Sequence, residues 1–180
     1  GLMRWSQFVP PQTEDTYGTL FVETKGAVTK FPMVFARTYS DQGELGTYGQ
    51  GIAAFSAQRP NVTAQKAAVI PGVREERDDP ANKGYYTNIG LLNLTDQPTE
   101  VRIALLDEIT GAEIGATGTM LGANESKIIP SIISKVPLHP SAARGSIKVQ
   151  VVSGGPIWAF ASIIDNKTKD AEYVPAVPLP

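Results

Sequence analysis

Cysteine is absent from this 180-residue sequence, and histidine occurs once, at His139. Without cysteine the chain has no disulfides, no thiolate nucleophile and no zinc–thiolate site. A catalytic triad or a histidine-based metal site would have to use His139, and no serine lies in the sequence context of a nucleophile elbow. We therefore expect a protein that is not an enzyme and that holds no cofactor.

Strong charge and long apolar runs are lacking as well. The formal net charge is −2, so no long-range positive field attracts nucleic acid, and no glycine-rich phosphate-binding motif is present. No apolar run reaches the roughly 18 residues that a membrane-spanning helix needs. We therefore expect no nucleic-acid partner and no membrane insertion.

Glycine and proline are frequent, with 17 and 14 residues. They divide the chain into short segments, which suits β-strands better than long helices. Apolar residues alternate with polar ones, or cluster between turn residues, in Leu20–Thr24, Met33–Ala36, Ile89–Leu94, Val101–Leu105, Ile147–Val151 and Ile157–Ile164. The best helical candidate is short, at Glu125–Ser134, and Pro130 interrupts it.

One sequence pattern occurs twice. Gly-Thr-Leu-Phe-Val-Glu at 18–23 matches Gly-Ser-Ile-Lys-Val-Gln at 145–150. Each copy continues with a glycine-containing turn and an apolar strand that ends in Phe-Ala, at Phe35 and at Phe160. A tyrosine follows at the same spacing in both copies, as Tyr48 and Tyr173. The pattern predicts that a hairpin and the loop after it are present twice.

The two copies are not equally complete. Ahead of the second copy lie strands of its own, between Tyr85 and Pro140. We therefore predict a partial β repeat over residues 1–57, the back half of a sandwich unit, and a full β-sandwich repeat over residues 67–180. An incomplete sandwich leaves an open strand edge, and such edges pair with strands of a neighbour. A homo-oligomer formed through this edge is one expected consequence.

Three segments resemble a repeated Ig-like β-sandwich domain of bacterial secreted and surface proteins. They are RTYSDQGELGTYGQGI (Arg37–Ile52), TNIGLLN (Thr87–Asn93) and WAFASIIDNKTKDAEYVP (Trp158–Pro175). The family has arginine before Thr-Asn, where this chain has Tyr86. The resemblance implies an all-β, antiparallel Ig-like sandwich with one full unit and a partial one. It also implies a location outside the cell, at its surface or in the periplasm, and it implies no catalytic residues.

Four side chains are candidates for ligand binding: Arg37, Tyr39, Tyr48 and Gln50. A strand followed by a glycine-rich return brings them near each other, and aromatic and amide groups together bind sugar rings by stacking and hydrogen bonds. The alternative is structural: an arginine bonded to carbonyl groups inside a sandwich, with tyrosines packed over it.

The segment Asp165–Asp170 is the candidate metal site, because Asp165, Asn166 and Asp170 offer oxygen ligands of the kind that calcium prefers. The pattern departs from an EF-hand loop, and Lys167 and Lys169 oppose a cation. The alternative is a turn in which Asp and Asn side chains bond their own backbone. The charged segment Arg74–Pro80 has adjacent carboxylates, and we interpret it as a solvated loop rather than a glycosidase acid pair.

These observations together predict a non-enzymatic structural or adhesive interaction module of an exported bacterial protein. Its expected partner is a protein or a glycan at the cell surface. The alternative is a carbohydrate-binding module that uses surface aromatic side chains, and this alternative requires the tyrosine rings to be exposed.

Overall fold

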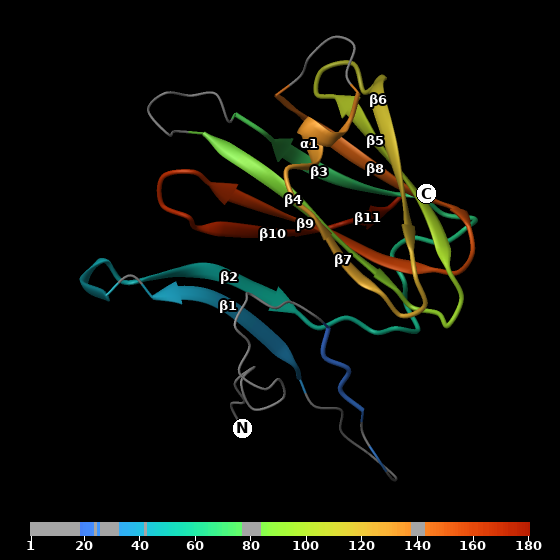
Figure 1. The fold of residues 1–180 in the computed structure, drawn as a ribbon, viewed down its shortest axis with the longest axis horizontal. Coiled ribbons are helices and arrows are strands. Elements are labelled where there is room, and N and C mark those ends of the chain that lie inside the picture. The colour runs from blue at the N-terminus through green and yellow to red at the C-terminus, as the bar shows by residue number, and fades with distance from the viewer. Residues whose placement is uncertain (1–18, 24, 26–32, 42, 77–83, 138–142) are drawn as a thin grey trace.

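The computed structural model describes residues 19–23, 25, 33–41, 43–76, 84–137 and 143–180. Its regular structure is almost entirely β (Figure 1). The first strands of the described chain form a separate hairpin, in which β1 (Phe35–Asp41) pairs antiparallel with β2 (Thr47–Ala53). A single 3-10 turn, Gly43–Leu45, joins these two strands.

The remaining strands form two antiparallel sheets. The five-stranded sheet has the order β11-β3-β8-β5-β6 and the four-stranded sheet has the order β10-β9-β4-β7. Their bounds are β3 Ala68–Arg74, β4 Tyr85–Asn93, β5 Thr99–Asp107, β6 Glu113–Leu121, β7 Ser126–Ile129, β8 Arg144–Ser153, β9 Ile157–Asp165, β10 Ala171–Pro175 and β11 Val177–Pro178. The protein is therefore an all-β antiparallel sandwich, as the alternating pattern predicted.

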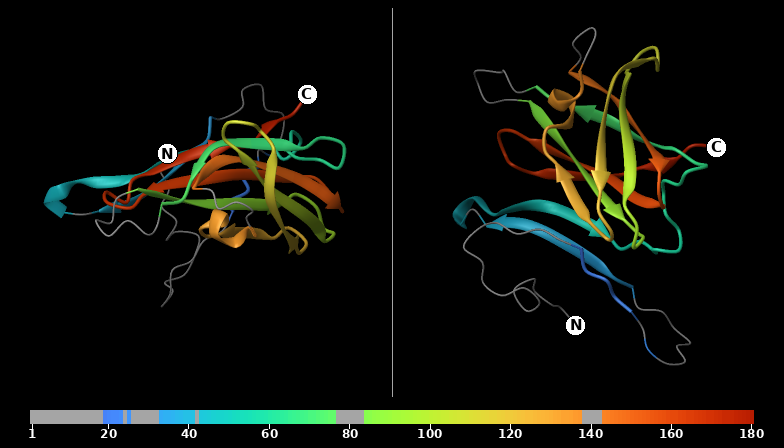
Figure 2. Two further views of the ribbon diagram at one scale, coloured as in Figure 1. Left: turned by 90° about the horizontal axis from the view of Figure 1, so that it is seen from above. Right: turned by 45° about the vertical axis from the view of Figure 1, so that its right-hand side comes forward.

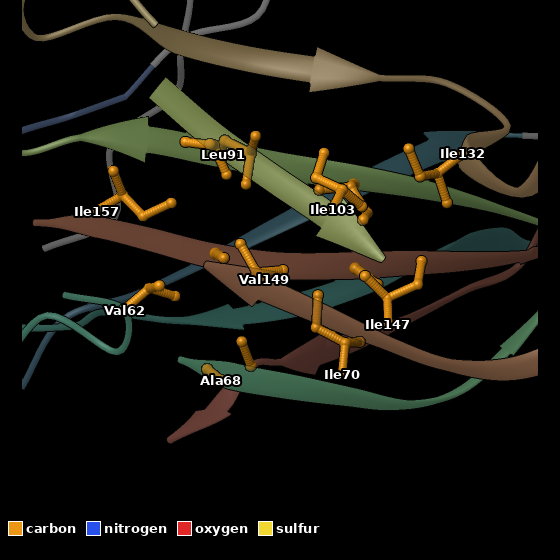
Figure 3. Packing of buried hydrophobic residues seen from close by; sticks show 14 of the residues in the cluster. Val62, Ala68, Ile70, Leu91, Ile103, Ile132, Ile147, Val149 and Ile157 are labelled. Carbon is orange, nitrogen blue, oxygen red and sulfur yellow. The ribbon is translucent and has the colours of Figure 1, made fainter. Parts of the chain in front are cut away.

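The core lies between the two sheets and is built from aliphatic side chains of both. Figure 3 shows Ile103, Ile147 and Val149 of the five-stranded sheet packed against Leu91 and Ile157 of the four-stranded one. In β8 the even positions Lys148 and Gln150 are half-buried on the outer face while the odd positions are buried, which is the period of two predicted from the sequence. Removal of this apolar surface from water is the main stabilising term for the sandwich.

The connection between β8 and β9 differs from the sequence prediction. The two strands were expected to pair as a hairpin, but β8 pairs with β3 and β5, whereas β9 pairs with β4 and β10. Since both edges of β8 are occupied, the chain crosses to the other sheet. Gly154 makes the crossing possible: its φ is +94°, and a Cβ there would lie 2.4 Å from the Pro98 carbonyl oxygen.

Two further local predictions are wrong. The helical candidate Glu125–Ser134 contains strand β7, and only one helical turn follows, α1 (Ile132–Lys135), after Pro130. The segment expected as a strand near Leu20 forms none in its described residues 19–23. A strand needs a neighbour to satisfy its backbone groups, and no strand in the described part of the chain pairs with these residues.

The segment between the two predicted repeats, which we call the junction, is partly built into the sandwich. The Asn61 amide nitrogen donates to the carbonyl oxygens of Ala159 (2.7 Å) and Ala176 (3.0 Å), and its oxygen accepts from the Ala159 N–H (2.8 Å). Val62 is fully buried and pairs with Ile157. The chain is therefore anchored to β9 just before it enters the sandwich.

Candidate interaction surface

The β1–β2 hairpin lies beside β10, the edge strand of the four-stranded sheet (Figures 1 and 2). It is a separate two-stranded sheet, joined to the sandwich through side chains. The Gly49 N–H donates to Asp170 Oδ1 (3.0 Å), and the Ser162 hydroxyl donates to Gln50 Oε1 (3.1 Å). At the far end the Phe55 ring stacks on Trp158, with 4.0 Å between ring centres. The hairpin is thus docked at three points rather than paired as a strand.

Aromatic side chains of β9 and β10 form the surface on which the hairpin docks. The Phe160 and Tyr173 rings lie 5.1 Å apart, and Trp158 Nε1 donates to the Tyr173 hydroxyl (3.4 Å). Burial raises the pKa of the Tyr173 hydroxyl. Across the pair of strands, Phe160 lies opposite Gly90, and a Cβ on that glycine would be 2.1 Å from the ring. Gly90 is therefore required by the ring that covers it.

The hairpin and the residues before it carry exposed apolar side chains. Six of the ten large apolar side chains that are exposed in the described residues fall between positions 20 and 35: Leu20, Phe21, Val22, Met33, Val34 and Phe35. We call this set the N-terminal apolar surface. Met33 is 92% and Phe35 75% exposed. Exposed apolar groups that gather in one segment commonly mark an interaction site, whereas single ones elsewhere need no explanation.

The structure does not bring the four predicted ligand-binding residues together. In the ladder Arg37 lies opposite Gly51 and Tyr39 opposite Gly49, whereas Tyr48 and Gln50 occupy the alternate positions of β2. Because side chains alternate across a strand, the Arg37 side chain is on the opposite face from those of Tyr48 and Gln50. The side chain of Tyr39 lies outside the described part of the structure.

Their surroundings also differ. The Arg37 side chain is exposed, with one guanidinium nitrogen 3.5 Å from the Thr47 hydroxyl. Tyr48 and Gln50 are half-buried, and Gln50 is engaged by Ser162. A sugar platform made of all four side chains is therefore not formed by this hairpin.

The two carboxylates proposed as metal ligands already accept backbone hydrogen bonds, from their own turn and from Gly49 of β2. Asp165 Oδ1 accepts the N–H groups of Lys167 and Thr168, both at 2.7 Å, and these bonds hold the pKa of its carboxyl below the usual value. Asn166 is buried, and its amide lies 3.4 Å from the Glu76 carbonyl oxygen. Asp170 Oδ1 accepts from Gly49 and Ala171. The described contacts fit the turn alternative.

A second turn of the same construction was not recognised in the sequence. Asp107 Oδ1 accepts the N–H groups of Ile109 (3.1 Å) and Thr110 (2.7 Å), as Asp165 does in its own turn. Both segments read Asp-x-x-Thr. This short repeat in the sequence could have predicted both turns. It indicates that the hydrogen bonds of Asp165 belong to a kind of turn that occurs twice in the protein.

The other described polar groups do not gather into a reactive site. A shallow depression of about 440 Å³ lies over β5 and β6, lined by Glu100, Arg102 and Thr117 among others, and Arg102 is paired there with Glu113. In the described ranges no three His, Cys, Asp or Glu residues lie close enough to hold a metal ion. His139 and most of the acidic segment after Glu76 lie outside the described residues.

Comparisons with known proteins name no relative with a known role. No family model and no curated protein match the sequence. The crystal structure of Thermotoga maritima 1070 is similar over 63% of this chain and 92% of that chain, with 12% sequence identity and a TM-score of 0.46. A similarity this weak assigns neither a family nor a role to this chain. Among the described helices none is long and apolar enough to cross a membrane.

Proposed function

We propose that this protein is a non-enzymatic interaction module, structural or adhesive in kind, of an exported bacterial protein. It acts through the N-terminal apolar surface and binds a protein at the cell surface. Export is supported only by the resemblance of the three sequence segments to repeated surface domains. The contact with a partner is supported by the exposed side chains themselves.

The observation that carries this proposal is the exposure of Phe35, at the start of the docked hairpin, and of Met33 and Phe21 in the residues before it. Burial of apolar surface contributes about 25 cal/mol for each Å² removed from water. Side chains of this size therefore provide a substantial driving force for association once a partner covers them. The carboxylates of Asp165 and Asp170 accept backbone N–H groups of the Asp165 turn and of Gly49 in β2, and this engagement supports binding rather than catalysis.

The test compares two substitutions by serine, made at two side chains of equal exposure. Met33, on the N-terminal apolar surface, and Ile109, at a turn of the sandwich, are both 92% exposed. Beads coated with wild type, Met33→Ser or Ile109→Ser are passed over surfaces coated with bacterial envelope proteins, host matrix proteins or glycans. We expect retention of wild type and Ile109→Ser on a protein surface and loss of retention with Met33→Ser.

Two results would contradict the proposal. Equal retention of the two serine variants would show that the partner does not bind at the N-terminal apolar surface. Retention on glycans that is lost on Tyr48→Ala and kept on Met33→Ser would favour the carbohydrate-binding alternative instead.

A further inference from the structure

β6 is an edge strand of the five-stranded sheet and pairs with β5 alone among the described strands (Figure 1). The Lys127 amino group, from β7 of the other sheet, donates to the Met120 carbonyl oxygen (2.9 Å), so this carbonyl points away from β5. Alternate residues of an antiparallel strand direct their backbone groups to the same side. The N–H and C=O groups of Ala116 and Gly118 therefore also point to the outer edge, where no described residue bonds to them.

The chain itself restricts access to the two ends of this edge. A Cβ on Gly115 would lie 2.1 Å from the Pro137 carbonyl oxygen, so the chain after α1 packs against β6 there. At the other end Lys127 also donates to the Thr119 hydroxyl (3.2 Å). A lysine at a sheet edge commonly prevents further pairing. Between these points lie residues 116–118, which contain no charge and no proline. We call them the open edge segment.

The open edge segment also lines the depression of about 440 Å³ over β5 and β6. Arg102, which lines it too, lies on the outer face of the sheet, because the residues before and after it are buried in the core. Its ladder partner Gly118 shares that face, as do Ala116 and Met120. Met120 is 53% exposed. One strand thus carries a hollow above small residues and, two positions further on, an exposed apolar side chain.

We infer that the open edge segment pairs with the same segment of a second copy of this chain, antiparallel, about a two-fold axis at Thr117. Under such symmetry one surface serves both copies, which suits a short segment with restricted ends. In this register Ala116 of one copy is opposite Gly118 of the other, and the two residues exchange both backbone hydrogen bonds. The two five-stranded sheets become one continuous sheet.

The same register explains the depression and the exposed methionine together. Met120 of one copy lies diagonally across from Ala116 of the other, about 7–8 Å away, a separation that a long side chain spans. Each methionine therefore fills the depression of the other copy. This contact does not use the N-terminal apolar surface, so the inference does not depend on the proposed function.

A single introduced cysteine tests the register, because the chain has no cysteine of its own. In Thr117→Cys the two cysteines form a non-hydrogen-bonded pair with Cα atoms about 4.5 Å apart, within the range of a disulfide. Thr119→Cys is the matched control, on the same strand and also half-buried. Its two cysteines lie about 13 Å apart along the strands. Under mild oxidation we expect a disulfide-linked dimer of Thr117→Cys, formed about tenfold or more faster than that of Thr119→Cys.

Two changes at Gly118 test the edge hydrogen bonds. A Cβ there would meet only the Val101 carbonyl oxygen, at 3.5 Å, so Gly118→Ala fits and keeps the N–H. Gly118→Pro removes the N–H that faces the edge and leaves the bonds to β5 in place. In sedimentation velocity of the full chain we expect wild type and Gly118→Ala at twice the chain mass of 19.2 kDa. The dimer of Gly118→Pro should dissociate at about tenfold or more higher concentration.

Every other result overturns the inference. A wild type that sediments as a monomer across the micromolar range would exclude the dimer. Equal cross-linking of the two cysteine variants would indicate random collision, and equal dissociation of the two Gly118 variants would exclude edge pairing. A dimer in which Thr117→Cys does not cross-link would place the contact elsewhere. If Gly118→Pro fails to fold, the cysteine variants decide alone, because neither of them removes a backbone N–H.

Discussion

β1 and β9 end the same sequence pattern with the same Phe-Ala pair, but their surroundings are opposite. Ala161 is fully buried between the sheets, whereas Ala36 is exposed. β9 has a strand on each side, whereas β1 has β2 alone among the described residues. The difference shows that the burial of each strand depends on its neighbouring strands rather than on its own sequence. Among the described residues β1 has fewer such neighbours than β9.

The two hairpins also differ in register. Phe35 pairs with Ala53 and Phe160 pairs with Pro175, so the ladders are offset by an odd number of positions. An odd offset moves a side chain to the other face. Phe160 and Tyr173 therefore share a face and contact each other, whereas the matching Phe35 and Tyr48 are on opposite faces. Equal spacing in the sequence did not produce equal geometry.

The largest expected effect comes from placing a charge at the matching alanines. Ala161→Asp puts an unpaired carboxylate in the core, which costs more than about 4 kcal/mol of unfolding free energy and should prevent stable folding. Ala36→Asp should change that free energy by less than about 0.5 kcal/mol. Urea unfolding followed by circular dichroism measures both. Similar losses in the two variants would mean that β1 is covered in solution.

Asn61 tests whether the chain between the hairpin and the sandwich is fixed to β9. Asn61→Ala leaves the Ala159 N–H and two carbonyl groups without their side-chain partner, so we expect a loss of about 1–3 kcal/mol in unfolding free energy. Arg59→Ala, two residues earlier and exposed, is the control and should be neutral. A neutral Asn61→Ala would mean that the junction is not anchored to β9.

Phe55 tests how firmly the hairpin is docked. Phe55→Ala removes the ring stacked on Trp158, an interaction worth about 0.5–1.5 kcal/mol beyond the area it buries. We expect faster amide exchange in β2 and a change in tryptophan emission, with an unchanged melting temperature of the sandwich. Phe21→Ala, at an exposed side chain, is the control and should change neither the amide exchange nor the emission. Unchanged amide exchange in β2 of Phe55→Ala would contradict docking at this point.

The smallest effect is a pH dependence at the Asp165 turn. Hydrogen bonds from Thr168 and Lys167 lower the pKa of the Asp165 carboxyl below 3.8. The stabilisation of the folded state by this carboxylate is therefore present above that pH and is lost as the pH falls through the lowered pKa. Asp165→Asn should therefore be less stable than wild type at neutral pH and equal to it in strong acid. Thermal melts across this range measure the difference; a gap that widens in acid would contradict the assignment.

Much of the sandwich could be predicted from the sequence, because its core strands alternate clearly. The segments at Val101–Leu105, Ile147–Val151 and Ile157–Ile164 lie within β5, β8 and β9. β3 was not recognised, since Pro71-Gly72 reads as a turn but forms a bulge between Ile70 and Val73. The glycine- and threonine-rich β6 gave no clear pattern either.

The candidate surface was less predictable than the fold. Met33–Ala36 reads as a buried strand, because an apolar run carries no information about whether a neighbouring strand is present to cover it. The opposite faces of Arg37 and Gln50 follow from the hairpin register, which the loop at Gly43–Leu45 sets. Neither property is local to the residues concerned.

The most direct measurement is amide hydrogen exchange, residue by residue, along β1 and β9 in the isolated protein. The account predicts that in β1 the Ala36 and Thr38 amides are protected and the Phe35 amide exchanges faster, because the first two bond to β2 and Phe35 does not. In β9 it predicts continuous protection from Phe160 to Ile164, where strands lie on both sides. Protection of Phe35 equal to that of Ala36 and Thr38 would contradict the claim that β1 has fewer neighbouring strands than β9.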